Sequence, residues 1–224
     1  AIAEALTNIV WSPLTHGLKG VSLSANWMWP SKNSGEDARL YKAVEAVSNF
    51  AIHLGLNVPT GKDSLSMTQK YPDGEVVYAP GTVIISAVGE VLDIRKTISP
   101  VIQPLEGSKL LYVDFSCDSK KLGGSSFAQI LNLLGNEVPT IKDDAYFAKA
   151  FEAIQDLIKS DFIIAGHDIS EGGLITTLLE MCFATPDIGL TVGLHAFGDD
   201  LIKILFRENP GVVVQTRNET EVLS

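Results

Sequence analysis

The stretch VPTGKDSLSM, residues 58–67, brings a glycine, a lysine, an aspartate and two serines together. These residue types suit a phosphate: glycine permits close backbone approach, lysine carries positive charge, and the serine hydroxyls donate hydrogen bonds. A P-loop, however, has four residues between its first glycine and a Gly-Lys-Ser/Thr triplet. Here five residues separate Gly55 from Gly61, and Asp63 takes the place of the hydroxyl residue. The stretch is therefore not a P-loop, and we predict a polar loop that follows a helix.

A second candidate site is GHDISEGG, residues 166–173, where a short apolar strand ends and a helix begins. A helix N-terminus presents unsatisfied N–H groups and the positive end of the helix dipole, so such turns often hold anions and metals. Asp168 is a candidate metal ligand, and Ser170 is a candidate helix cap and phosphate donor. The structural alternative is a capping box, but Gly173 stands where that box needs Glu or Gln. Both interpretations stay open.

Glu4 and Asn8 form a third candidate, because their i, i+4 spacing places them on one face of a helix predicted over residues 1–11. A carboxylate and an amide oxygen on one face suit a single hard cation such as Mg²⁺. A solvated helix face remains the alternative. The glycine-led stretch LGGSS, residues 122–126, is a weaker fourth candidate. No Ser-His-Asp or Cys-His arrangement is legible, so we assign no catalytic nucleophile.

The composition describes a globular protein and excludes some classes. Hydrophobic residues make up 46% of the 224 residues and charged residues 20%, which supports a buried core. The net charge of −10 argues against a nucleic-acid surface, which needs clustered Lys and Arg. Cys117 and Cys182 lack metal-ligand spacing and are expected as reduced thiols. No apolar run reaches about 18 residues and no secretory signal opens the chain, so we expect a soluble cytoplasmic protein without membrane contact.

Hydrophobic periodicity assigns the elements that carry these candidates. A strand is predicted within residues 20–30, a helix from Leu40 to Leu54 that Gly55 ends, and a strand over 81–91. Prolines and lost periodicity near residues 94–106 mark a boundary, which divides the chain into domains over 1–94 and 95–224. Beyond it strands and helices alternate, as in α/β layers. Those strands are predicted over 109–116, 162–168, 188–194 and 211–216, and the helices over 123–135, 145–160, 170–184 and 199–208.

In their order along the chain, six segments resemble the synthetase region of the large phosphoribosylformylglycinamidine synthases, a family of the aminoimidazole-ribotide-synthetase superfamily. They are EALTNI, LSANWM, GEDARLYKAVEAV, VPTGKDSLSM, GTVIISAVGEVLDIRKT and GHDISEGGL, and they cover most of the chain. The resemblance implies the second of two tandem halves. Its fold would be the end of an N-terminal-type α+β domain followed by a C-terminal-type α/β domain, and we expect both to be truncated.

The resemblance also implies a function. Enzymes of this family are ATP-dependent ligases of purine biosynthesis that convert formylglycinamide ribonucleotide and glutamine to formylglycinamidine ribonucleotide. A separate glutaminase domain supplies ammonia, so that domain and the first synthetase half are the expected partners within one polypeptide. This piece would supply part of the catalytic interface and an auxiliary site for magnesium with ATP or ADP. Alone, it is expected to be inactive.

Carried over by position, Glu4, Asn8 and Asp168 match magnesium ligands of the auxiliary site, and Ser170 matches its nucleotide contact. A further family aspartate would lie upstream of Ala1.

In the opening stretch, Gly61 matches a glycine beside ATP and Ser64 matches a serine beside the substrate. Smaller relatives have asparagine where Lys62 stands, so we expect Lys62 to make a phosphate or structural contact instead of a metal contact. Asp63 and Asn26 are expected beside it on the substrate side.

Two alternatives remain beside this resemblance. One is another superfamily member, such as an aminoimidazole-ribotide synthetase. The residues of GKDSLSM and LSANWM argue against it. The other is a binding or scaffold module with a degenerate site and no ligand. A truncated α+β domain exposes sheet edge and core, so we also expect self-association.

Overall fold

The computed structural model describes residues 1–223. These residues form two compact units, and each is described by itself. The first unit comprises Ala1–Ile9 and Thr15–Glu90, and the second comprises Val10–Leu14 and the described residues from Val91 onward. The division thus falls at Val91, whereas the sequence places it at residue 95, and the short segment Val10–Leu14 joins the second unit.

The first unit is built on a three-stranded sheet with the strand order β2-β1-β5. Strand β1 (Ser22–Met28) pairs in parallel with β2 (Asn57–Ser64) and antiparallel with β5 (Thr82–Val88). β1 and β5 are the strands that the apolar alternation predicts. Because side chains alternate between the two faces of a strand, every second residue of β1 is buried.

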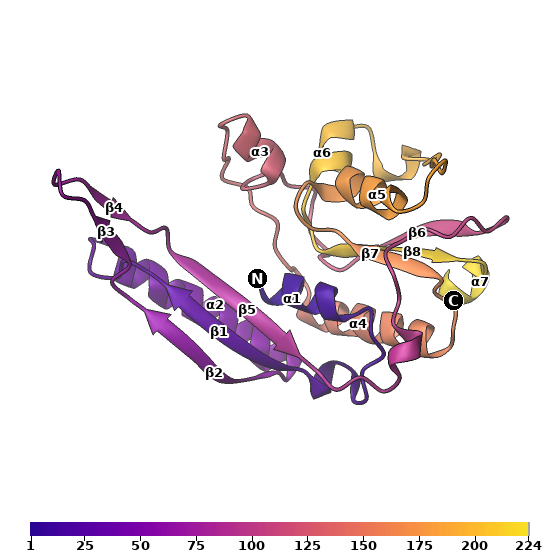
Figure 1. The fold of residues 1–224 in the computed structure, drawn as a ribbon, viewed down its shortest axis with the longest axis horizontal. Helices are drawn as coiled ribbons and strands as arrows, with labels where there is room; N and C mark the ends of the chain where they lie inside the picture. The colour runs from indigo at the N-terminus through magenta and orange to yellow at the C-terminus, as the bar shows by residue number, and fades with distance from the viewer. Residues whose placement is uncertain (224) are drawn as a thin grey trace. The chain divides into compact units, whose positions relative to one another are not determined.

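Helix α2 (Glu36–Leu54) covers one face of this sheet (Figure 1). It ends at Gly55, whose left-handed φ of 72° and backbone N–H close the last turn, as the sequence predicts. The core between helix and sheet combines aromatic and aliphatic side chains from both elements. Its members are Ala25, Trp27, Trp29, Leu40, Ala43, Val47, Val83 and Ile85.

The predicted loop at residues 58–67 is wrong, because most of this stretch forms edge strand β2. An edge strand exposed on both faces shows no apolar alternation, so its periodicity gives no signal. Pro59 is tolerated because it lies in an edge strand. The close approach expected at Gly61 is confirmed, but its partner is protein backbone: a Cβ there would lie 2.0 Å from the carbonyl oxygen of Ala25.

Smaller elements complete the first unit. Helix α1 (Ile2–Ile9) contacts β5, and a 3₁₀ turn spans Gly17–Gly20. Strands β3 (Thr68–Lys70) and β4 (Val76–Tyr78) form a two-stranded hairpin that extends away from the three-stranded sheet (Figure 1).

The second unit has a sheet with the order β6-β8-β7. Both outer strands, β6 (Lys109–Asp114) and β7 (Ala165–Asp168), pair antiparallel with the central β8 (Gly211–Thr216). All residues of β8 are buried, as expected for a strand covered on both faces. The predicted strands at these three places are therefore confirmed, with β7 shorter than its apolar run.

Helices cover both faces of this sheet (Figure 1). Helix α4 (Asp144–Lys159) lies on one face, and α5 (Gly173–Phe183) and α6 (Leu201–Phe206) lie on the other. The core under α5 is apolar and contains Ile102, Ala165, Ile169, Leu174, Leu178, Met181, Ile204 and Val213. These layers confirm the mixed α/β fold.

Two expectations for this unit fail. The predicted strand at 188–194 forms neither strand nor helix, because its backbone takes no place in the β6-β8-β7 ladder. The glycine-led helix predicted over 123–135 shrinks to α3 (Ser126–Ile130).

The remaining elements are two 3₁₀ turns, Ile94–Lys96 and His195–Phe197, and α7 (Glu219–Leu223). Among residues 1–223, no helix has the length and apolar character to cross a membrane.

Candidate functional site

Asp168 ends strand β7, directly before the turn that leads into helix α5. Asp168 is only 6% exposed. Its carbonyl oxygen accepts a hydrogen bond at 3.0 Å from Oγ1 of Thr177, which lies one turn into α5. The neighbouring Gly166 leaves room for the ring of Trp11, which a Cβ would meet at 2.1 Å. The backbone around the carboxylate is therefore fixed by packing and by α5, which suits a metal ligand.

His167 lies between two carboxylates. Its Nδ1 is 3.5 Å from Asp168 Oδ1, and its Nε2 is 3.3 Å from Glu180 Oε2. The pKa of His167 is raised above its ordinary value, first through the hydrogen bond with Asp168, while partial burial acts in the opposite direction. The closest contact of the imidazole is nevertheless with the backbone, since Nδ1 lies 2.9 Å from the Asp168 carbonyl oxygen.

The turn from Ser170 to Gly173 does not have the predicted cap. The N-cap of α5 is Gly172 in a left-handed conformation (φ 85°), and no side chain caps the helix. The carbonyl oxygen of Ser170 instead accepts from Gly173 N at 3.0 Å. Ser170 as a helix cap is therefore wrong, because the two glycines form the turn with their own backbone. Its role as a nucleotide contact remains a prediction.

Glu4 and Asn8 lie on the exposed face of α1 in the first unit. Asn8 Nδ2 donates to the Glu4 carbonyl oxygen at 2.9 Å, so the amide oxygen of Asn8 is turned away from the helix backbone. Asn8 also borders a cavity of about 370 Å³ that residues of α1 and β5 line. A carboxylate and an amide oxygen on one helix face fit Mg²⁺, which prefers hard oxygen ligands.

The predicted metal ligands divide between the units, with Glu4 and Asn8 in the first and Asp168 in the second. Within residues 1–223, no three His, Cys, Asp or Glu side chains gather into a metal cluster. The predicted ligands are two carboxylates, Glu4 and Asp168, and the amide of Asn8. The magnesium site built from these three residues remains a prediction.

The register of β1 and β2 brings Asn26 opposite Lys62, which supports their expected proximity. Because alternate residues face opposite sides, both lie on the face that α2 does not cover, together with Ser64. Lys62 Nζ donates to Ser64 Oγ at 2.9 Å. Asp63 lies on the other face, opposite Trp27, so the strand separates it from this group.

One polar contact of the second unit was absent from the sequence prediction. Glu208, beyond the end of α6, accepts hydrogen bonds from Ser126 N and Gly172 N. Both donors belong to glycine-led stretches that the sequence marks as candidates. No local motif surrounds Glu208, so only the folded chain reveals this contact.

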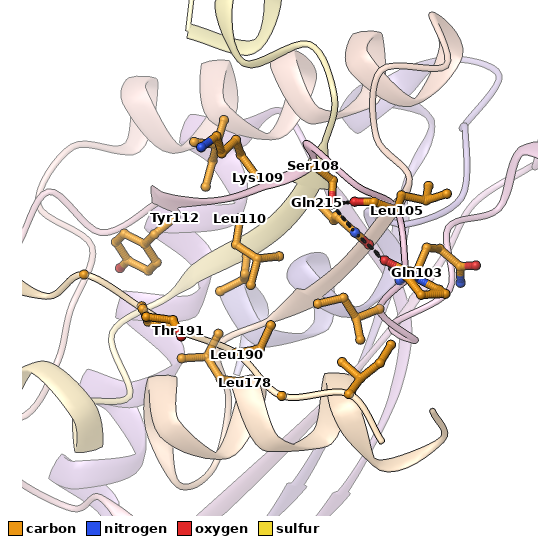
Figure 2. Close-up of a pocket in the computed structure, with 18 of the residues that line it drawn as sticks. Gln103, Leu105, Ser108, Lys109, Leu110, Tyr112, Leu178, Leu190, Thr191 and Gln215 are labelled. Carbon is orange, nitrogen blue, oxygen red and sulfur yellow. Dashed lines mark hydrogen bonds between the residues drawn. The ribbon is translucent and has the colours of Figure 1, made fainter. Parts of the chain in front are cut away.

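A cavity of about 670 Å³ lies apart from these residues (Figure 2). Side chains of β6 and α5 line it with the segment 187–193, and no predicted site residue borders it. At one end, buried Gln215 accepts from Gln103 N at 2.9 Å and donates to Ser108 Oγ at 2.8 Å. These bonds satisfy the Gln215 amide internally, and the cavity walls combine polar and apolar side chains.

Two family models match the chain. The FGAR-AT PurM_N-like domain matches residues 1–90, and the AIR synthase related protein, C-terminal domain, matches residues 106–224. The two matches correspond closely to the two units of the structure.

Curated relatives match almost the whole chain. It is 43% identical over 217 residues to the probable chloroplastic/mitochondrial phosphoribosylformylglycinamidine synthase of Arabidopsis thaliana. This alignment covers 96% of the chain and 15% of the relative. It is 41% identical over 218 residues to the phosphoribosylformylglycinamidine synthase of Homo sapiens, covering 97% of the chain and 16% of the relative. The chain thus spans about one sixth of these relatives' length.

Solved structures share the fold at low identity. T. maritima PurL complexed with FGAR has a TM-score of 0.64 at 15% identity, over 99% of this chain and 35% of that one. T. maritima PurL complexed with ATP has a TM-score of 0.56 at 11% identity, over 99% of this chain and 34% of that one. These likenesses agree with the observed fold, and the domain match over residues 106–224, more than half of the chain, shows that the chain belongs to the AIR synthase related family.

Proposed function

We propose that this chain is part of a phosphoribosylformylglycinamidine synthase and takes part in its ATP-dependent amidation of formylglycinamide ribonucleotide. The observation that carries the proposal is identity of 43% and 41% to two such enzymes over nearly the whole chain. The arrangement of the site residues agrees with it, because Asp168 is buried at the end of β7 and the register of β1 and β2 brings Asn26 opposite Lys62.

In this reaction the substrate amide oxygen attacks the γ-phosphorus of ATP, and ADP leaves. Ammonia then adds to the activated carbon, and phosphate leaves with the former amide oxygen. Such phosphoryl transfers depend mainly on positioning and on stabilisation of negative charge. Glutamine would supply the ammonia through a glutaminase domain elsewhere in the longer polypeptide.

Within this scheme the second unit would contribute Asp168 as a magnesium ligand and the turn at Ser170 as a phosphate contact to the auxiliary nucleotide site. Glu4 and Asn8 are the magnesium ligands proposed in the first unit. When bound, magnesium neutralises part of the phosphate charge. The burial of Asp168 supports this role, since a side chain held by its surroundings loses little conformational entropy on binding a metal.

The first unit would contribute to the catalytic interface through the open face of its sheet. Asn26, Lys62 and Ser64 share that face, and Gly61 allows the strand backbone to lie close to a ligand or to β1. Apolar Ile84 and Val88 on the same face are 51% and 66% exposed. We propose that the first synthetase half packs on this face, which would place Lys62 beside the substrate.

The assay that tests the proposal compares the 224-residue chain with the longer polypeptide that contains it. Each is supplied with formylglycinamide ribonucleotide, ATP, magnesium and ammonia, and phosphate release is measured. The longer polypeptide is expected to release phosphate only when the ribonucleotide is present. The chain alone is expected to release none, because its open sheet face lacks the other half. Phosphate release by the chain alone, or none by the longer polypeptide, would refute the proposal.

Lys62→Ala in the longer polypeptide is expected to lower kcat/KM by about 10- to 100-fold, the effect of losing one hydrogen bond to a charged group. Steady-state kinetics with varied ribonucleotide measure it. Lys70→Ala on strand β3 is the matched control, because Lys70 is an exposed lysine of the hairpin. Equal kcat/KM for the Lys62 variant and the wild type would remove Lys62 from the substrate site.

A further inference from the structure

Three helix ends meet in the second unit. The ring of Phe206, the last residue of α6, stacks on Phe127 of α3 with centroids 4.6 Å apart. The start of α5 lies against the same turn, since a Cβ on Gly173 would be 2.7 Å from the carbonyl oxygen of Arg207. The end of α6 and the residue after it therefore pack against the first turns of α3 and α5.

Glu208 completes this arrangement with hydrogen bonds. Its Oε1 accepts from Ser126 N at 2.8 Å and from Gly172 N at 2.8 Å. Both amides lie at helix starts, where backbone N–H groups lack partners within the helix and the helix dipole favours a negative charge. One carboxylate oxygen thus joins two helix starts that lie far apart in the sequence.

Gly172 belongs to the turn of the candidate nucleotide site, so its hydrogen bond links Glu208 to that site. The turn that follows Asp168 is closed on one side by the bond from Gly173 N to the Ser170 carbonyl oxygen. The Glu208 carboxylate holds the other side through Gly172 N. The turn has no side-chain cap of its own, so Glu208 supplies from another element the acceptor that a capping residue would give.

We propose that Glu208 is a positioning residue for this nucleotide site. Its carboxylate holds the start of α5 so that Asp168 and Ser170 keep the spacing that a magnesium nucleotide requires, and it couples this turn to the LGGSS start of α3. The inference rests on the proposed auxiliary site. Polar groups that support a ligating residue commonly change affinity by about 10- to 100-fold when they are removed.

The test compares three variants of the chain. Glu208→Ala removes the acceptor, whereas Glu208→Gln keeps an oxygen at the same place and removes the charge. Glu106→Ala is the control, because Glu106 is an exposed glutamate of the second unit that lies outside both glycine-led stretches. Two readouts are recorded: the amide proton signals of Ser126 and Gly172 by NMR, and the dissociation constant of magnesium ADP by calorimetry.

For Glu208→Ala we expect upfield shifts and faster exchange of both amides, with magnesium ADP bound about 10- to 100-fold more weakly. Glu208→Gln should recover most of the affinity, and Glu106→Ala should match the wild type. If the alanine variant does not fold, Glu208→Asp tests the same point, since the shorter side chain keeps the charge but loses the reach.

The outcomes separate this inference from the proposed function. A wild type that binds no magnesium ADP, both as this chain and when extended upstream of Ala1, contradicts the proposed site itself. A wild type that binds and a folded Glu208→Ala or Glu208→Asp variant that binds equally well overturn the positioning role, and unchanged amide signals overturn the contact.

Discussion

Gln155→Leu is expected to lower the free energy of unfolding by about 3 kcal/mol, since it removes the side-chain partner of three backbone groups, two of them in buried contacts. Gln155 of α4 is fully buried. Its Oε1 accepts from Leu14 N at 2.7 Å, and its Nε2 donates to the carbonyl oxygens of Val10 at 2.6 Å and Ser12 at 3.0 Å. The Gln155 side-chain amide therefore holds the segment Val10–Leu14 to α4, within the second unit.

Urea unfolding measures this effect. Gln129→Leu is the control: Gln129 is exposed on α3 and its amide donates only to the Gly124 carbonyl oxygen at 2.8 Å. Its change in the free energy of unfolding should stay within about 0.5 kcal/mol, as for most surface substitutions. An unchanged urea midpoint for Gln155→Leu would mean that the segment is held by packing alone.

Asp168→Asn is expected to weaken the binding of magnesium ADP by about 10- to 100-fold, the range typical of lost contacts at a metal site. Asparagine keeps the shape of the side chain and leaves the backbone carbonyl free to accept from Thr177 Oγ1. The loss should therefore come from the missing charge on a magnesium ligand. Without magnesium, the variant and the wild type should bind ADP equally.

Calorimetric titrations with magnesium and with EDTA measure both affinities. Asp156→Asn is the control, because Asp156 is an exposed aspartate of α4 in the same unit. Equal losses with and without magnesium would assign Asp168 a structural role in the turn instead of a metal role.

The sequence predicts those elements best whose apolar pattern has one clear period. Helices α2, α4 and α5 and strands β1, β5 and β8 all appear near their predicted places. Strand β2 is missed because it is an exposed edge strand whose composition, with Pro59 and Gly61, resembles a loop. Segment 188–194 is wrongly predicted as a strand for the opposite reason, since its alternation is regular but it has no place in the described ladder.

The candidate site follows the same division between local and distant information. Asp168 and Gly61 are predicted as candidates from short motifs, because each motif lies within one strand or its following turn. The Asn26–Lys62 pairing depends on strand register, and the Glu208 contacts join residues 36 and 82 positions apart. Such contacts arise from packing, so no local pattern predicts them.

The measurement that tests this account most directly is thermal unfolding of the chain with ADP, in the presence of magnesium or of EDTA. With magnesium, ADP at 100 times its dissociation constant is expected to stabilise the chain by about 2.7 kcal/mol, and the same ADP concentration in EDTA is expected to stabilise it less. Identical unfolding in both solutions, for this chain and for one extended upstream of Ala1, would contradict a magnesium nucleotide site built from Glu4, Asn8 and Asp168.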